Sequence, residues 1–235
     1  MAYAWVADNF AEFATSDSTV AVTLNGVTAG NLLVVTISIG NADARTISSV
    51  ADGTNTYNAV TNVYSAIISW RQWMYYCVPG TGGNLTITAT FSGAVTGGRA
   101  IMVTEYSGGH ATPLDGTNYT TVDAEGNADG TETIGPLTPS ENDCLLVASL
   151  ADGTVTAYGT PINGYTIGQD SDPDICNVCQ LYLIQTTAAA STAGATGNAW
   201  GSYCGCMAVF KAAAAAGGAA GGGAYYQHYY LSVVT

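Results

Sequence analysis

The chain contains an apolar segment, Gly30–Gly40 (GNLLVVTISIG), that is echoed later by Asn142–Ala151 (NDCLLVASLA). In the first copy, apolar side chains occupy nearly consecutive positions from Leu32 to Ile39. That pattern is typical of a central strand that is buried on both faces of its sheet. The segment therefore predicts a covered sheet, and its echo predicts that this arrangement occurs twice.

The segments that follow each copy come in the same order. The matched pairs are Val50–Tyr57 with Pro161–Ile167, Trp73–Val78 with Gln180–Ile184, Thr81–Ser92 with Thr186–Gly197, and Arg99–Tyr106 with Ser202–Phe210. Self-similarity at a fixed spacing is a signature of duplicated architecture. Chance likeness between strands rich in Thr, Gly and Val is the alternative, since the match is one of pattern more than of identity.

Strand patterns separated by turn signals run through the rest of the chain. Thr19–Leu24 alternates with period two, as half-buried strands do, and the turn signal Asn25-Gly26 follows it. Val63–Val78 is too long for one ordinary strand, so we expect it to bend or to carry a bulge. No helical period occurs before Lys211. About a dozen short strands predict an all-β fold, an antiparallel, jelly-roll-like β-sandwich.

We expect one sandwich body, residues 1–211, with two similar halves at about 3–108 and 140–211. The stretch Ser107–Glu141 between them is rich in Gly, Asp and Thr, and a connection of that length holds an edge strand or a functional loop. Residues 212–224 are almost entirely Ala and Gly, which predicts a flexible linker.

The last segment, residues 225–235, is aromatic and β-branched (YYQHYYLSVVT). A free terminus that exposes such a segment is unfavourable in water, so we expect a docking strand that pairs with other β structure. Its apolar side chains are the predicted assembly residues Tyr225, Tyr226, Tyr229, Tyr230, Leu231, Val233 and Val234.

The net charge of the chain restricts the kinds of molecule that it can bind. Only 9% of residues are charged, and 4 basic against 17 acidic side chains give a net charge of −13. Phosphate backbones and anionic lipids repel such a chain, so we expect neither nucleic acid nor membrane as a partner. A surface built from Thr, Ser, Asn and Gly is typical of proteins in dense assemblies or outside the cell. Because Met1–Trp5 does not begin a signal-peptide pattern, we expect synthesis in a host cytoplasm.

Six short motifs along the chain resemble a group of β-sandwich domains found in phage structural proteins and bacterial surface proteins. The residues that carry the resemblance are Gly30–Val35, Asp52–Tyr57, Tyr75-Tyr76, Thr86–Gly93, Glu105–Gly108 and Ala208–Lys211. The resemblance covers roughly residues 3–211; the six cysteines and the terminal tail depart from it. It implies a β-sandwich in a structural or adhesive setting, and it supplies no catalytic residues.

Four of the six cysteines form two close pairs, Cys176 with Cys179 and Cys204 with Cys206. Two such pairs can supply the tetrahedral sulfur shell of a zinc site. In a strand, however, positions 176 and 179 point to opposite faces, so a zinc site requires a turn or bulge at Asn177. Disulfides formed in an oxidising medium and buried free thiols are the other two interpretations.

Acidic residues at alternate positions, Asp170, Asp172 and Asp174, suggest calcium, which favours oxygen clusters. The EF-hand pattern fails, because Ile175 and Leu181 stand where Gly and Glu belong, and solvated acidic loops are the simpler interpretation. Ser107, His110 and Asp115 superficially resemble a hydrolase triad, but no nucleophile-elbow pattern surrounds the serine, and we interpret them as loop residues.

Aromatic residues cluster between residues 70 and 76. A glycan-binding face is one interpretation, with Trp70, Trp73 and Tyr75 as the platform and Arg71 as a hydrogen-bond donor. Alternation along a strand places these residues on both faces, so at least half of them should belong to the core.

No catalytic constellation stands out, and we expect neither enzymatic activity nor a cofactor. The preferred hypothesis is a phage virion subunit, a capsid decoration or tail-associated protein, that binds copies of itself or other virion proteins. The mechanism would be β-strand addition through residues 225–235, in which backbone hydrogen bonds provide affinity and alternate side chains fill pockets. The alternatives are an extracellular filament or surface-layer subunit that polymerises by donor-strand exchange, and a carbohydrate-binding module.

Overall fold

The computed structural model describes residues 2–40, 45–125, 128–153, 157–171, 175–197 and 201–214. Every regular element in these ranges is a β-strand, which confirms the predicted all-β antiparallel fold. The strands are β1 (Ala4–Phe13), β2 (Asp17–Val27), β3 (Leu32–Ile39), β4 (Ile47–Ala51), β5 (Asn58–Ser65), β6 (Trp70–Cys77), β7 (Gly83–Val95), β8 (Arg99–Ser107), β9 (Gly109–Glu125), β10 (Thr131–Leu137), β11 (Cys144–Asp152), β12 (Thr166–Asp170), β13 (Val178–Gln185), β14 (Ser191–Thr196) and β15 (Ser202–Ala212). Within the described residues, no helix is long and apolar enough to cross a membrane.

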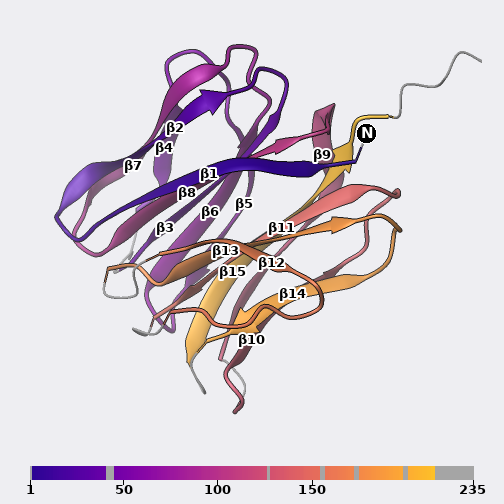
Figure 1. The fold of residues 1–235 in the computed structure, drawn as a ribbon. Coiled ribbons are helices and arrows are strands. Elements are labelled where there is room, and N and C mark those ends of the chain that lie inside the picture. The colour runs from indigo at the N-terminus through magenta and orange to yellow at the C-terminus, as the bar shows by residue number, and fades with distance from the viewer. Residues whose placement is uncertain are drawn as a thin grey trace, which may run out of the picture.

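The strands form four sheets, two in each half of the chain. The first inner sheet has the order β1-β8-β3-β6-β5, and the first outer sheet has the order β2-β7-β4. The second inner sheet has the order β12-β13-β11-β15-β9, and the second outer sheet pairs β10 with β14. Figure 1 shows the two inner sheets in the middle of the molecule, with the outer sheets above and below them.

The strand order repeats between the halves. Read from its other edge, the second inner sheet is β9-β15-β11-β13-β12, which corresponds strand for strand to β1-β8-β3-β6-β5. The pairing of β10 with β14 corresponds to that of β2 with β7, and a bridge between Pro161 and Ala195 stands where β4 pairs with β7. The segment pairs matched in the sequence occupy corresponding strands, so the repeat predicted from pattern is confirmed by topology.

Two sequence predictions need correction. The stretch 107–141 is not a connection between halves, because it contains β9 and β10, and the second half therefore begins at Gly109 instead of about residue 140. β9 is an edge strand, as one of the two interpretations of this stretch predicted, whereas β10 was missed because its sequence lacks a continuous apolar run. The segment 63–78 is also not one bent strand, since a turn after Ser65 separates β5 from β6, which pair antiparallel. Ser69 has a φ of 57° in this turn.

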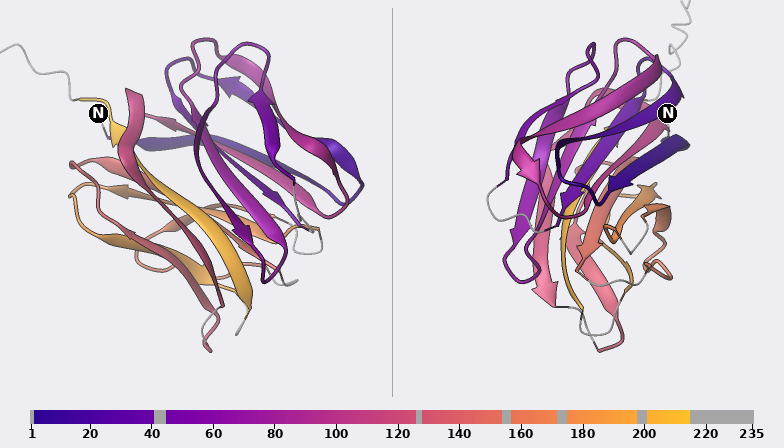
Figure 2. Two further views of the ribbon diagram at one scale, coloured as in Figure 1. Left: turned by 180° about the vertical axis from the view of Figure 1, so that it is seen from behind. Right: turned by 90° about the vertical axis from the view of Figure 1, so that its left-hand side faces the viewer.

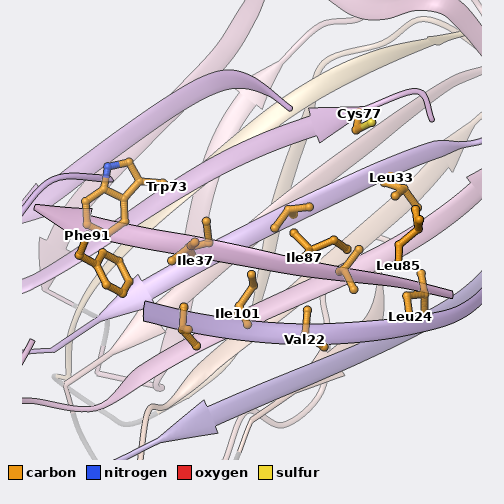
Figure 3. Packing of buried hydrophobic residues seen from close by; sticks show 14 of the residues in the cluster. Val22, Leu24, Leu33, Ile37, Trp73, Cys77, Leu85, Ile87, Phe91 and Ile101 are labelled. Atoms are coloured by element: carbon orange, nitrogen blue, oxygen red, sulfur yellow. The ribbon is translucent and has the colours of Figure 1, made fainter. Parts of the chain in front are cut away.

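Each half encloses its own core between its inner and outer sheets. In the first half, residues from β2 and β7 meet residues from β3 and β8, among them Val22, Ile87, Ile37 and Ile101 (Figure 3). In the second half, β10 and β14 cover β11, β13 and β15 in the same way. The predicted burial of Leu32–Ile39 on both faces is confirmed, since every residue of β3 is buried, as is every residue of β11.

The opposite faces of the two inner sheets pack against each other and form a third region of core. Leu32, Val34 and Met74 of the first half meet Leu145, Val147 and Phe210 of the second. Hydrogen bonds cross this interface from Gln72 Nε2 to Ser149 Oγ, at 2.9 Å, and from Thr104 to Gln180 Oε1. The molecule is therefore a stack of four sheets, which Figure 2 shows from two further sides.

Two aromatic contacts show that this interface is approximately two-fold symmetric. The strand registers pair Val34 with Tyr76 and Val147 with Tyr182, and they pair Leu32 with Tyr106 and Leu145 with Phe210. Tyr76 is thus equivalent to Tyr182, and Tyr106 to Phe210. The rings of Tyr76 and Phe210 lie 5.9 Å apart at 65°, and those of Tyr106 and Tyr182 lie 5.6 Å apart at 67°. Exchanging the halves converts one contact into the other, as in an isologous dimer interface.

Candidate functional site

The most apolar exposed feature of the described surface is β1, an edge strand of the first inner sheet. β1 pairs with β8 along one edge, and within the described residues no strand pairs with its other edge. Four large apolar side chains on this strand are exposed: Trp5 at 45%, Val6 at 38%, Phe10 at 39% and Phe13 at 43%. Unpaired backbone groups beside exposed apolar side chains form a template for strand addition.

Contacts at both ends hold β1 in place. Next to its first residue, the hydroxyl of the buried Tyr3 donates a 2.6 Å hydrogen bond to the carbonyl of Lys211. At the other end, the Arg99 guanidinium donates to the carbonyls of Thr15 and Val95 and lies 5.9 Å from the centre of the Phe13 ring. Between these ends, Ala7 and Ala11 pack against the first core. The open edge is therefore presented by a strand with a fixed position.

A cleft lies at the Phe13 end of β1. Its volume is about 330 Å³, and it is lined by Phe13, Thr15, Asp17, Thr19, Val20, Ala21 and Arg99. Apolar carbons, hydroxyls, the Asp17 carboxylate and the Arg99 guanidinium line the same hollow. Such a mixture suits an aromatic side chain with a polar tip, such as tyrosine.

The equivalent edge strand of the second half, β9, has a different surface. Its sequence, GHATPLDGTNYTTVDAE, contains one proline and is dominated by Thr, Gly and acidic residues. The exposed large apolar side chain on it is Tyr119, at 38%. Its pairing with β15 is also interrupted by register shifts near Phe210. Both edge strands carry charges and shift register, but the proline and the single exposed apolar ring make β9 the poorer template for strand pairing.

The predicted assembly residues, Tyr225 to Val234, lie outside the described residues. Sequence analysis missed the apolar edge of β1. The signal was present in the aromatic residues Trp5, Phe10 and Phe13. The register shift between Trp5 and Ala7 puts Trp5 and Phe10 on one face of β1, whereas Phe13 lies on the other face. A period-two pattern therefore does not show which of these side chains faces solvent.

The cysteines predicted as a zinc site are spread over three parts of the core. Cys179 belongs to the second core, Cys206 lies between the inner sheets, and Cys176 and Cys204 share a smaller cluster at the edge of that interface. Within the described residues, no three His, Cys, Asp or Glu side chains are close enough to hold a metal ion. All six cysteines are free and buried, and burial raises the pKa of Cys176, Cys179 and Cys206 well above the usual range. This arrangement matches the interpretation as buried thiols.

The acidic run predicted as a calcium candidate is described only in part. Asp172 and Asp174 lie outside the described residues. Asp170 ends β12, where burial, together with the charge of Glu12 on β1, raises the pKa of its carboxyl to about 6. Asp170 therefore lies at the boundary between the two halves rather than on a fully solvated loop.

The superficial triad does not come together. Asp115 accepts hydrogen bonds from Ser140 and Asn118, whereas His110 Nδ1 contacts Thr112. Ser107 contacts the carbonyl of Ala4 at 3.5 Å. Each residue is engaged in separate local contacts, but the interpretation as loop residues was wrong, because Ser107 ends β8 and the other two residues lie in β9.

The proposed glycan face is divided between the two sides of β6. Trp70 packs beside the interface between the halves, whereas Arg71, Trp73 and Tyr75 line a cleft of about 300 Å³ on the other side. Trp73 is only 6% exposed and packs against Phe91, with ring centres 6.2 Å apart. Arg71 lies over the ring of Tyr64, 4.6 Å from its centre. The cleft exists, but the face of its largest ring is turned into the core.

A buried acid in the second core was also missed from the sequence. Glu132 on β10 is fully buried, and its Oε2 accepts a 2.8 Å hydrogen bond from the hydroxyl of Tyr158. Burial, together with the nearby charge of Asp152, raises the pKa of Glu132 to about 9. The carboxyl is therefore neutral at pH 7. Its complete burial is typical of a structural group.

The fold is a duplicated β-sandwich, and β1 forms an open edge with exposed apolar side chains. Comparisons of the chain with models of protein families, with curated proteins and with solved structures found no match.

Proposed function

We propose that this chain is a non-enzymatic structural subunit of a phage virion, a capsid decoration or tail-associated protein, that assembles by β-strand addition. Residues 225–235 are the donor strand, and the Ala/Gly-rich residues 212–224 set its reach. The partners are copies of the same chain or other virion proteins. In strand addition, backbone hydrogen bonds contribute affinity, and alternate side chains contribute specificity.

The observation that carries this proposal is the exposed apolar edge of β1. Trp5, Val6, Phe10 and Phe13 lie on one strand that is held at both ends. In a protein that stays alone in solution, this edge would favour uncontrolled association. In a subunit of an assembly, the same edge is covered. The low charge of the chain and the resemblance of its motifs to phage structural domains support the same conclusion.

The test compares the native mass of three proteins over a range of concentrations. They are the full chain, a deletion of residues 225–235, and a control in which the same residues are replaced by an equally long Gly/Ser segment. We expect the full chain to form oligomers and both altered proteins to have the mass of one chain. Oligomers of undiminished stability in both altered proteins would refute the proposal. For the virion setting, we expect peptides of this chain in purified phage particles.

A further inference from the structure

We propose that residues 225–235 of one copy add as a strand to the open edge of β1 in a neighbouring copy. This inference rests on the proposed function and specifies its acceptor. The donor has eleven residues and β1 has ten, so the two strands match in length. The Asn9 side chain, which accepts from the Phe10 N–H and donates to the carbonyl of Thr23, covers one position of this edge.

The donor, residues 225–235, and the acceptor, β1, both carry large apolar side chains. Seven of the residues from Tyr225 to Thr235 are Tyr, Leu or Val, and an added strand would place part of them beside Trp5, Phe10 and Phe13. Aromatic and β-branched side chains on adjacent strands stabilise a sheet by about 0.2–1 kcal/mol per pair. The cleft beside Phe13 and Arg99 offers a tyrosine side chain of the donor an additional place to bind.

Charge favours this donor over a second copy of β1. β1 carries two carboxylates, Asp8 and Glu12, so pairing of two β1 strands would bring four carboxylates into one short ladder. Like charges on adjacent strands are destabilising. The donor contains no Asp or Glu, and its remaining polar side chains are Gln227, His228, Ser232 and Thr235.

The place where the described chain ends favours pairing between copies. Ala2 and Ala212–Ala214 line the same hollow, and Ala213 donates a hydrogen bond to the carbonyl of Gly108, so the chain leaves the body beside the start of β1. Figures 1 and 2 show the N-terminus next to the end of β15. Every strand pair in the described residues is antiparallel, so we expect the donor to pair in this orientation as well. An antiparallel partner of β1 begins at the other end, near Phe13, about 33 Å away.

The ten residues 215–224 reach at most about 33–36 Å when fully extended. Antiparallel pairing within one copy would therefore stretch this segment to its limit, at a large cost in conformational entropy. A neighbouring copy can place the Phe13 end of its own β1 closer to the donor. The reach of the linker thus favours exchange between copies.

The test uses full-length chains and two matched substitutions. Phe10→Lys changes a side chain on β1 that is 39% exposed, and Tyr119→Lys changes one on the equivalent strand β9 that is 38% exposed. Sedimentation velocity measures association, and hydrogen exchange followed by mass spectrometry measures protection of the β1 amides. We expect Phe10→Lys to weaken association at least tenfold and to remove the concentration-dependent protection of β1. Tyr119→Lys should leave association within twofold of the unmodified chain.

The outcomes separate the two proposals. If deletion of 225–235 abolishes association but Phe10→Lys does not, the acceptor is wrong and the proposed function stands. If the deletion has no effect on association, both are wrong. A full chain that stays monomeric, with β1 protection that the deletion removes, shows pairing within one copy and overturns exchange. Phe10→Thr, which adds no charge, should weaken association in the same direction, and equal unfolding temperatures verify that the variants are folded.

Discussion

The two halves share a topology, but their cores differ in chemistry. The inner-sheet registers pair Ile39 with Arg99 in the first half and Asp152 with Tyr203 at the equivalent place in the second. Where the first core has an isoleucine, the second has a buried carboxyl group, and Glu132 lies in the same region. The same strand order is therefore compatible with buried carboxyl groups in place of apolar side chains, provided that these groups have hydrogen-bonding partners, as Glu132 has in Tyr158.

The edges of the two halves differ as well. β1 exposes four large apolar side chains, distributed over both of its faces, whereas β9 exposes one, Tyr119, in a sequence rich in Thr and Gly. Both strands end their inner sheets and have the same place in the topology. The difference therefore lies in the side chains and not in the strand order.

The largest predicted effect tests whether the halves depend on each other. Ile37 and Leu150 occupy equivalent positions in the two cores, and both are fully buried. We expect Ile37→Ala and Leu150→Ala each to lower the free energy of unfolding by about 2–5 kcal/mol, because each leaves a cavity. Since the inner sheets share a core, both variants should unfold in a single transition in urea. Two separate transitions would show that the halves are independent.

The second prediction tests the chemical difference between the cores. The raised pKa of Glu132, about 9, means that the folded chain holds a proton that the unfolded chain releases above about pH 4.5. The free energy of unfolding should therefore fall as pH rises from about 4.5 to about 9, by at most about 1.4 kcal/mol per pH unit from this group.

Glu132→Gln should remove this part of the pH dependence and stabilise the chain by about 2 kcal/mol near pH 9, because an amide stays neutral. Urea unfolding at pH 6 and pH 9 measures the difference. The exposed Glu141→Gln is the control for loss of a formal charge. An equal loss of stability between pH 6 and pH 9 in Glu132→Gln and the unmodified chain would contradict the assignment.

The features that depend on local pattern could be predicted from the sequence. Continuous apolar runs located β3 and β11, and the order of the following segments located the repeat. The start of the second half was missed because β9 and β10 have no such run. Glu132 and Tyr158 are 26 residues apart, and nothing local to either residue predicts that they meet. The division of Trp70 from Trp73 followed from alternation, but the burial of Trp73 depends on Phe91 in another sheet.

The third prediction concerns the interface, where the halves also differ. Gln72 and Val178 occupy equivalent positions, and Gln72 donates to Ser149 across the interface. We expect Gln72→Val to cost about 1–2 kcal/mol, because Ser149 loses its donor in a buried site. Adding Ser149→Ala should recover part of this loss. A double-mutant cycle in urea measures the coupling, and strictly additive losses would show that the hydrogen bond contributes nothing.

The smallest predicted effect returns to the edges. Phe10→Thr and Tyr119→Thr replace side chains of similar exposure on equivalent strands, and each should change the stability of a single chain by less than about 0.5 kcal/mol. Urea unfolding of dilute protein that also lacks residues 225–235 isolates this contribution from association. A loss above about 1 kcal/mol for Phe10→Thr alone would mean that its ring supports the chain's own core. Equal, small effects would mean that the Phe10 ring adds little to the stability of a single chain. Its exposure on β1 would then be consistent with contacts to an added strand.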